Sequence, residues 1–109
     1  MKMTSAKFGI GDRVIHRLFK FSGIIIDVDP EFNNDEEWWL GIPAEIRPKK
    51  EQPYYHLLAL NEDESYKAYV SEQNLLSDVD VMPFDHPDLE DYFSVNNQGD
   101  LKSLNQNYN

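Results

Sequence analysis

Histidine, carboxylate and serine side chains are the residues of this chain whose types could support catalysis. The three histidines, His16, His56 and His86, are dispersed and lack the spacing of a zinc site. No serine lies in a Gly-x-Ser-x-Gly setting, and the chain has no cysteine for a nucleophile or a thiolate metal site. A carboxylate pair can always be found among twenty acidic residues, so such a pair carries little information. We therefore expect neither enzyme activity nor a bound metal ion or cofactor.

The alternating acidic residues Asp27, Asp29 and Glu31 superficially suggest a calcium-binding loop. An EF-hand loop requires Gly at its sixth position and Glu at its twelfth. Counted from Asp27, these two positions hold Phe32 and Trp38. The sequence therefore excludes a calcium loop of this type.

Basic side chains are unevenly distributed in a chain of 109 residues whose formal net charge is −10. Residues 1–30 hold five basic and three acidic groups, whereas residues 31–109 hold five and seventeen. Because an acidic protein repels phosphate at long range, nucleic-acid binding would require a local basic face. The candidate DNA-binding residues are Arg13, Arg17, Lys20, Arg47, Lys49 and Lys50. The alternative is that they are ordinary solvated side chains, just as the acidity can serve solubility alone.

Trp38 and Trp39 are the aromatic candidates for a binding surface. One ring can pin its loop to the rest of the domain, and adjacent residues usually face different environments. An exposed tryptophan would suit contact with a protein partner or an unstacked base.

The elements that must position these residues are mainly strands. Residues 13–18 and 23–28 alternate or are β-branched, which predicts a hairpin that ends at Asp29-Pro30. Strict alternation places Ile24, Ile26 and Val28 on one face, and if that face is the core, Ile25 is expected to point outward. An outward Ile25 is a third candidate for partner contact, compatible with a covering loop or with self-association.

A long excursion at residues 31–51 separates this hairpin from a second one. Pro43 and Pro48 bracket a predicted helical turn within the excursion. The second hairpin is predicted from strands 54–60 and 66–70, followed by a helical turn at 71–75 with Ser71 as its N-cap. A short fifth strand within 76–82 and a short helix at 88–93 complete the predicted elements.

Two hairpins with short helical turns predict an all-β fold, namely a small antiparallel SH3-like β-barrel with a long inter-strand loop. Residues 1–93 are expected to form one domain, and residues 94–109, rich in Asn and Gln, a flexible C-terminal tail. The sequence has no apolar run long enough to span a membrane and no apolar signal segment, so we expect a cytoplasmic protein.

A series of short motifs then follows in order: KFGIG at 7–11, VxH at 14–16, GIIIDVDP at 23–30, QPYYH at 52–56, AYV at 68–70, ExNL at 72–75, and HP at 86–87 before Phe93. This ordered set resembles the HspQ heat-shock proteins, also called the hemimethylated DNA-binding or YccV-like family. The long gap between the third and fourth motifs falls where that family carries a variable loop.

The resemblance implies a cytoplasmic β-barrel that responds to heat stress. It further implies binding of hemimethylated double-stranded DNA and modulation of Lon-type ATP-dependent proteolysis of unfolded client proteins, without any chemistry of its own. An alternative is a small SH3-like or KOW-like barrel that binds nucleic acid or transcription machinery, because Gly11-Asp12-x-Val14 is similar to the opening of such barrels.

Overall fold

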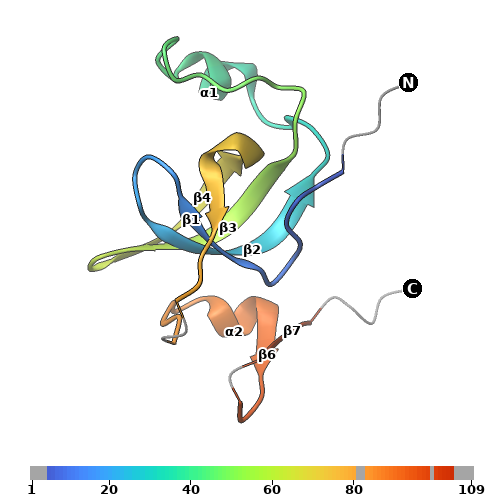
Figure 1. Ribbon diagram of the computed structural model, residues 1–109, viewed down its shortest axis with the longest axis vertical. Coiled ribbons are helices and arrows are strands. Elements are labelled where there is room, and N and C mark those ends of the chain that lie inside the picture. The colour runs from blue at the N-terminus through green and yellow to red at the C-terminus, as the bar shows by residue number, and fades with distance from the viewer. Residues whose placement is uncertain (1–4, 81–82, 99, 105–109) are drawn as a thin grey trace.

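The computed structural model describes residues 5–80, 83–98 and 100–104, and strands are the main regular element among them (Figure 1). The elements, in chain order, are β1 (Arg13–His16), β2 (Ser22–Asp29), α1 (Glu36–Leu40), β3 (Tyr54–Asn61), β4 (Glu64–Ser71), the single 3-10 turn η1 (Glu72–Asn74), β5 (Leu75–Ser77), α2 (Leu89–Tyr92), β6 (Phe93–Val95) and β7 (Leu101–Ser103). No helix of the described residues is long and apolar enough to cross a membrane.

Five of the strands form one antiparallel sheet in the order β4-β3-β2-β1-β5, and β6 pairs with β7 in a separate antiparallel ribbon. The predicted all-β class and both predicted hairpins are therefore confirmed. Over the described residues no pairing joins the edge strands β4 and β5. A closed barrel is not found, and the SH3-like barrel is not confirmed.

The first strand ends two residues earlier than predicted because a histidine side chain terminates it. His16 Nδ1 accepts hydrogen bonds from the backbone N–H groups of Leu18 (3.1 Å) and Phe19 (3.0 Å). Lys20 then adopts a positive φ of 65°, which returns the chain into β2. Residues 17–21 consequently form a compact turn, called the β1–β2 turn below.

Strand β2 contains a β-bulge, and Ile25 faces the main core rather than solvent. The pairing with β3 shifts between Ile25 and Asp27, so Ile26 is an extra residue on its strand. Ile25 and Val28 therefore both face the main core, and Ile25 is fully buried there. The prediction that Ile25 points outward is wrong, because both faces of the sheet are covered: Ile25 faces the main core, whereas Ile24 and Ile26 face the second cluster.

Each face of the sheet has its own hydrophobic cluster. The main core lies on the face that the curled sheet encloses and is made of Val14, Phe21, Ile25, Tyr55, Leu57, Ala59, Val70 and Leu75. On the opposite face, Ile24 and Leu58 pack with Phe84 and Phe93, which belong to the C-terminal unit of residues 83–104. Figure 1 shows this unit below the sheet and α1 with the excursion above it.

The β6–β7 ribbon occupies residues that the sequence suggested as a flexible tail. Leu101 of β7 packs against the second hydrophobic cluster, and Leu104 N–H donates to the carbonyl of Tyr92 (3.0 Å). Residues 105–109 of the predicted tail lie outside the described residues.

Helical segments differ from expectation mainly in the excursion. The predicted turn after Pro43 is present, since Ile46 N–H donates to the Pro43 carbonyl (3.0 Å), but α1 was not predicted. Asp35 caps α1 by accepting from the Glu37 N–H (3.3 Å). Ser71 occupies the predicted N-cap position of η1, although its side chain makes no capping hydrogen bond.

Candidate partner-binding groove

An apolar groove lies between the β1–β2 turn and the excursion. It has a volume of about 190 Å³. Its walls are Leu18 and Phe19 on one side and Trp38, Ile42, Ile46 and Pro48 on the other, above a floor of His16, Tyr54, Tyr69, Val70, Ser71 and Asn74. These twelve residues define what we call the apolar groove.

The wall made by the β1–β2 turn is rigid although it is exposed. Phe19 is 62% exposed, yet its ring stacks on the imidazole of His16 with centroids 4.7 Å apart. Because His16 Nδ1 accepts two N–H groups, its ring is neutral with the proton on Nε2. Burial, and to a lesser extent the charge of Arg17, lowers the pKa of His16, which favours this neutral form.

The opposite wall is held by Trp39 and Arg47. Trp39 Nε1 donates to the Pro48 carbonyl (2.9 Å), and the Arg47 guanidinium lies 5.0 Å from the Trp39 ring centroid. Arg47 also donates to the carbonyls of Ile42 (3.0 Å) and Leu40 (2.9 Å). Trp39 thus fastens the loop through its indole N–H and through Arg47.

Trp38 is the tryptophan that faces the groove. Its side of the excursion packs on the sheet through an aromatic cluster, in which Trp38 stacks near Phe32 (6.0 Å) and meets Tyr69 edge-on (5.5 Å). Tyr69 in turn stacks on Tyr54, with ring centroids 5.2 Å apart. Trp38 nevertheless remains 39% exposed. Its ring is therefore fixed in place while part of it stays available for contact.

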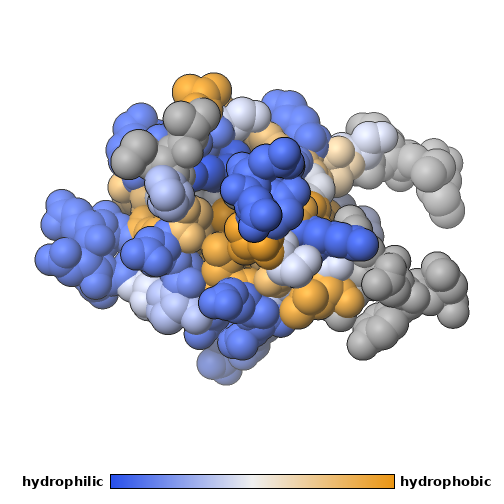
Figure 2. Space-filling view, turned by 90° about the horizontal axis from the view of Figure 1, so that it is seen from below, coloured by the Kyte–Doolittle hydropathy of each residue, from blue (hydrophilic) through white to orange (hydrophobic). Residues whose placement is uncertain are grey.

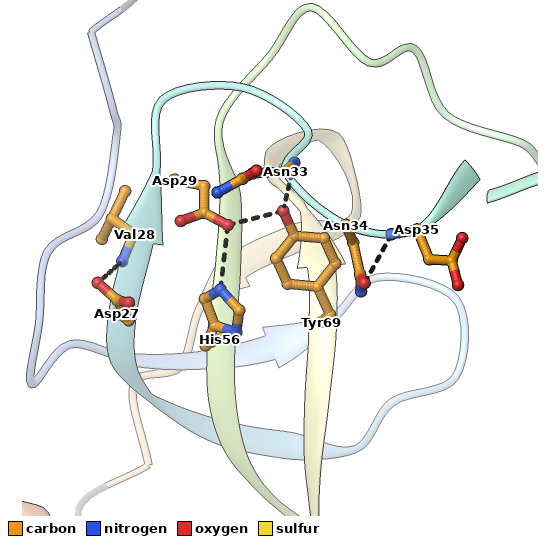
Figure 3. A network of polar contacts seen from close by, with 8 residues as sticks. All are labelled: Asp27, Val28, Asp29, Asn33, Asn34, Asp35, His56 and Tyr69. Carbon is orange, nitrogen blue, oxygen red and sulfur yellow. Dashed lines mark hydrogen bonds and ion pairs between the residues drawn. The ribbon is translucent and has the colours of Figure 1, made fainter. Parts of the chain in front are cut away.

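Polar contacts beside the aromatic cluster fix the start of the excursion (Figure 3). The Tyr69 hydroxyl donates to Asp29 Oδ2 (2.8 Å) and accepts from the Asn33 N–H (3.0 Å). The same Asp29 oxygen lies 3.0 Å from His56 Nε2. Burial, followed by the nearby Asp29 carboxylate, raises the pKa of Tyr69 far above its usual value, so the phenol stays protonated. This network joins the excursion to β2, β3 and β4.

Asp27, Asp29 and His56 also form a group whose ligand atoms lie within 4.8 Å of one another. Such a group is the minimum that could hold a metal ion. Asp29 Oδ2, however, is already used by Tyr69 and His56, and one Asp27 oxygen accepts from the Val28 N–H (2.9 Å). These hydrogen bonds account for the group as part of the scaffold.

Four of the six candidate basic residues are sequence neighbours of residues that line the apolar groove. Arg17 donates to the Asn74 side chain (3.1 Å) and the Gln73 carbonyl (3.1 Å) at the groove floor, and Lys20 lies in the same turn. Arg47 and Lys49 immediately flank Pro48 on the other wall. Lys20 and Lys49 are exposed, and no ion pair with a described residue is found for either.

The remaining two candidates are engaged elsewhere. Arg13 pairs with Asp78 (3.2 Å) and Asp80 (3.7 Å) and lies over the Phe84 ring (5.3 Å), next to the C-terminal unit. Lys50 forms an ion pair with Glu36 and lies 4.5 Å from the Trp39 ring centroid. The six residues therefore do not form one basic face, because Arg13 lies apart and Lys50 is neutralised.

A larger hollow of about 720 Å³ lies between the sheet and the C-terminal unit. Seen from the end at which the C-terminal unit lies, the molecule shows apolar surface between polar residues near the middle of the face (Figure 2). The lining mixes the apolar Leu89, Val95 and Leu101 with polar residues, and its arginine, Arg13, is already paired with two carboxylates. A smaller share of the lining of this hollow is apolar than in the apolar groove.

With this geometry established, comparison with known families gives one match. A family model described as "Hemimethylated DNA-binding protein YccV like" matches residues 6–100. The chain belongs to this YccV-like family. The match extends beyond residue 93 and includes the second hydrophobic cluster and part of the β6–β7 ribbon. The family is described by DNA binding and not by a reaction.

Sequence reasoning missed part of the groove of this YccV-like domain and misplaced one residue. Ile25 is buried in the main core and cannot touch a partner while the protein is folded. Leu18, Phe19 and Ile46 were not singled out, although they are 44%, 62% and 43% exposed on the groove walls. Phe19 precedes Lys20 and Ile46 precedes Arg47 in the sequence. Large apolar residues next to basic ones in predicted loops would have been the sequence signal for these groove walls.

Proposed function

We propose that this YccV-like protein is a non-enzymatic modulator of a Lon-type ATP-dependent protease in the cytoplasm, and that the apolar groove is its docking surface. The observation that carries the proposal is the exposure of large apolar side chains on both groove walls. Phe19, Trp38 and Ile46 are each more than a third exposed, and none of them belongs to either buried hydrophobic cluster. Exposed apolar patches of this kind mark interaction sites in soluble proteins.

To modulate the protease, this protein needs only different affinities for two of the protease's states. A protein that binds one state of a protease, or of a protease–client complex, more tightly shifts the population toward that state. The pinned walls of the apolar groove suit this role, because a preorganised surface pays little ordering entropy on binding.

The test is degradation of a model unfolded client by a purified Lon-type protease, titrated with this protein. We expect a change in degradation rate at micromolar concentrations. Trp38→Ala should raise the half-maximal concentration by about tenfold, the scale of an aromatic hot spot. Val79→Ser is the matched control, because Val79 is 89% exposed and lies outside the groove lining. An unchanged degradation rate at every concentration would overturn the proposal.

Hemimethylated DNA is a second candidate partner, favoured by the family description and by the cations that flank the groove. Lys20→Glu with Lys49→Glu should abolish duplex binding, whereas Lys102→Glu, which alters an exposed lysine on β7, should not. Binding should also weaken steeply as salt rises, since it rests on a few phosphate contacts. Equal binding by the double variant and the wild type would exclude this surface as the DNA site.

A further inference from the structure

We infer that the apolar groove binds an extended peptide segment in which one aromatic or large aliphatic residue is flanked by acidic residues. The inference rests on the proposed function and names the chemistry of the segment that docks. It follows from the size of the groove, from the use of its polar atoms and from the charges on its rim.

The size of the groove suits one large apolar side chain. A cavity of about 150 Å³ lined by apolar residues accommodates benzene, and the apolar groove has about 190 Å³. Its walls present Phe19 and Trp38, whose positions are fixed by stacking on His16 and on Phe32. An inserted phenyl or leucyl group would therefore meet aromatic surface on two sides without reordering the walls.

Most polar side-chain atoms on the groove floor already make hydrogen bonds within the protein. Asn74 Oδ1 accepts from Arg17 (3.1 Å), and Asn74 Nδ2 donates to Ser71 Oγ (3.3 Å). His16 Nδ1 accepts two backbone N–H groups. Reading the edge of a nucleobase requires free donors and acceptors, so this floor favours an apolar side chain over a base.

The rim of the groove is more basic than the rest of the molecule. Arg17 and Lys20 adjoin the lining residues Leu18 and Phe19, and Arg47 and Lys49 adjoin Pro48, so four of the ten basic residues of a chain of net charge −10 lie next to the groove lining. Three acidic residues, Glu37, Glu45 and Glu72, adjoin the lining too, which leaves a balance of four basic to three acidic groups. Lys20 and Lys49 are exposed, whereas Arg17 and Arg47 donate hydrogen bonds within the protein. Carboxylates on both sides of an inserted side chain would face these cations, which adds specificity and association rate.

The experiment measures fluorescence anisotropy of a short fluorescein-labelled peptide with one central Phe between pairs of Glu residues. We expect saturable binding to the wild-type protein. A peptide with Ser in place of the Phe should lose binding, and one with Lys in place of the Glu residues should bind at least about tenfold more weakly. Equal binding of all three peptides would overturn the inference.

Two pairs of variants place the site. Phe19→Ser and Ile46→Ser should each weaken binding by about tenfold, while Val79→Ser should not. Lys20→Glu with Lys49→Glu should weaken binding by about fivefold and remove most of its salt dependence, whereas Lys102→Glu should have no effect. Since all of these side chains are exposed, unchanged circular dichroism spectra are expected. Full binding by the groove variants would refute the site.

The outcomes also separate this inference from the proposed function. If the protein changes client degradation but does not bind the peptide, the modulator role stands and the inference fails. Displacement of bound peptide by hemimethylated duplex would show that DNA competes for the groove. Binding of a single-stranded oligonucleotide in place of the peptide would overturn the inference, because it would show that the groove accepts a base.

Discussion

Ile25 and Ile26 are adjacent in β2 but differ in burial, which leads to a prediction about what each contributes to stability. Ile25 is 0% exposed to solvent and packs in the main core. Its backbone is also held from both directions, because Ile25 N–H donates to the Asp12 carbonyl (3.0 Å) and its own carbonyl accepts from the Gly11 N–H (2.8 Å). A site held in this way cannot collapse around a missing side chain.

Ile25→Ala should therefore lie in the upper part of the range for such truncations, at about 4 kcal/mol. For a domain of this size, that loss corresponds to roughly 15 °C in melting temperature. Ile26→Ala should cost only about 1 kcal/mol, because Ile26 is partly exposed and lies at the rim of the second cluster.

Urea denaturation followed by tryptophan fluorescence gives both free energies, and Ile26 serves as the internal control for the same substitution. The alternation expected from sequence alone predicts the reverse order, with Ile26 more costly than Ile25. Equal or reversed losses would refute the burial of Ile25 in the main core and the position of Ile26 at the rim of the second cluster.

Three other contacts lead to measurable outcomes. Because burial lowers the pKa of His16, the unfolded chain binds a proton more readily than the folded one. The free energy of unfolding should therefore fall as the pH drops below about 6.5. His16→Asn keeps an acceptor for the turn and should flatten this pH dependence, measured by urea titrations at several pH values. Tyr69→Phe removes the hydrogen bonds to Asn33 and Asp29, and should destabilise by about 1–2 kcal/mol and speed proteolysis within residues 31–51; an unchanged cleavage pattern would contradict the anchoring role. Deleting residues 96–109 uncovers the second cluster by removing Leu101, so circular dichroism should show a melting temperature lower by several degrees, and an unchanged value would show that β7 is dispensable.

The strands could be predicted from sequence because their signals are local. Residues 54–60 are rich in apolar and aromatic side chains, and the polar residues that follow mark a turn, so β3 and β4 were located to within a few residues. The bulge has no such signal, since an extra residue inside Ile24-Ile25-Ile26 leaves the composition unchanged. Pairing with β3 decides which isoleucine is extra, and that is a property of the sheet.

The candidate site was predicted in part. Trp38 and the basic residues were named from their types, but their neighbours on the groove come from segments about twenty residues apart, which only the fold brings together. The missed helix α1 did carry a local signal, because Asp35 followed by Glu36 and Glu37 is typical of a helix N-terminus. Its five residues were too few to show the periodicity of an amphipathic helix.

The two-sided sheet has a consequence for the order in which the protein is made. Strands β1 to β4 are complete once Ser71 has been synthesised, and they contain most of the main core. Ile24 and Leu58 on the other face are covered by later residues, among them Phe84, Phe93 and Leu101. A growing chain on the ribosome can therefore form the sheet with a bare apolar face until residues 84–101 have emerged, and during this interval that face is open to aggregation.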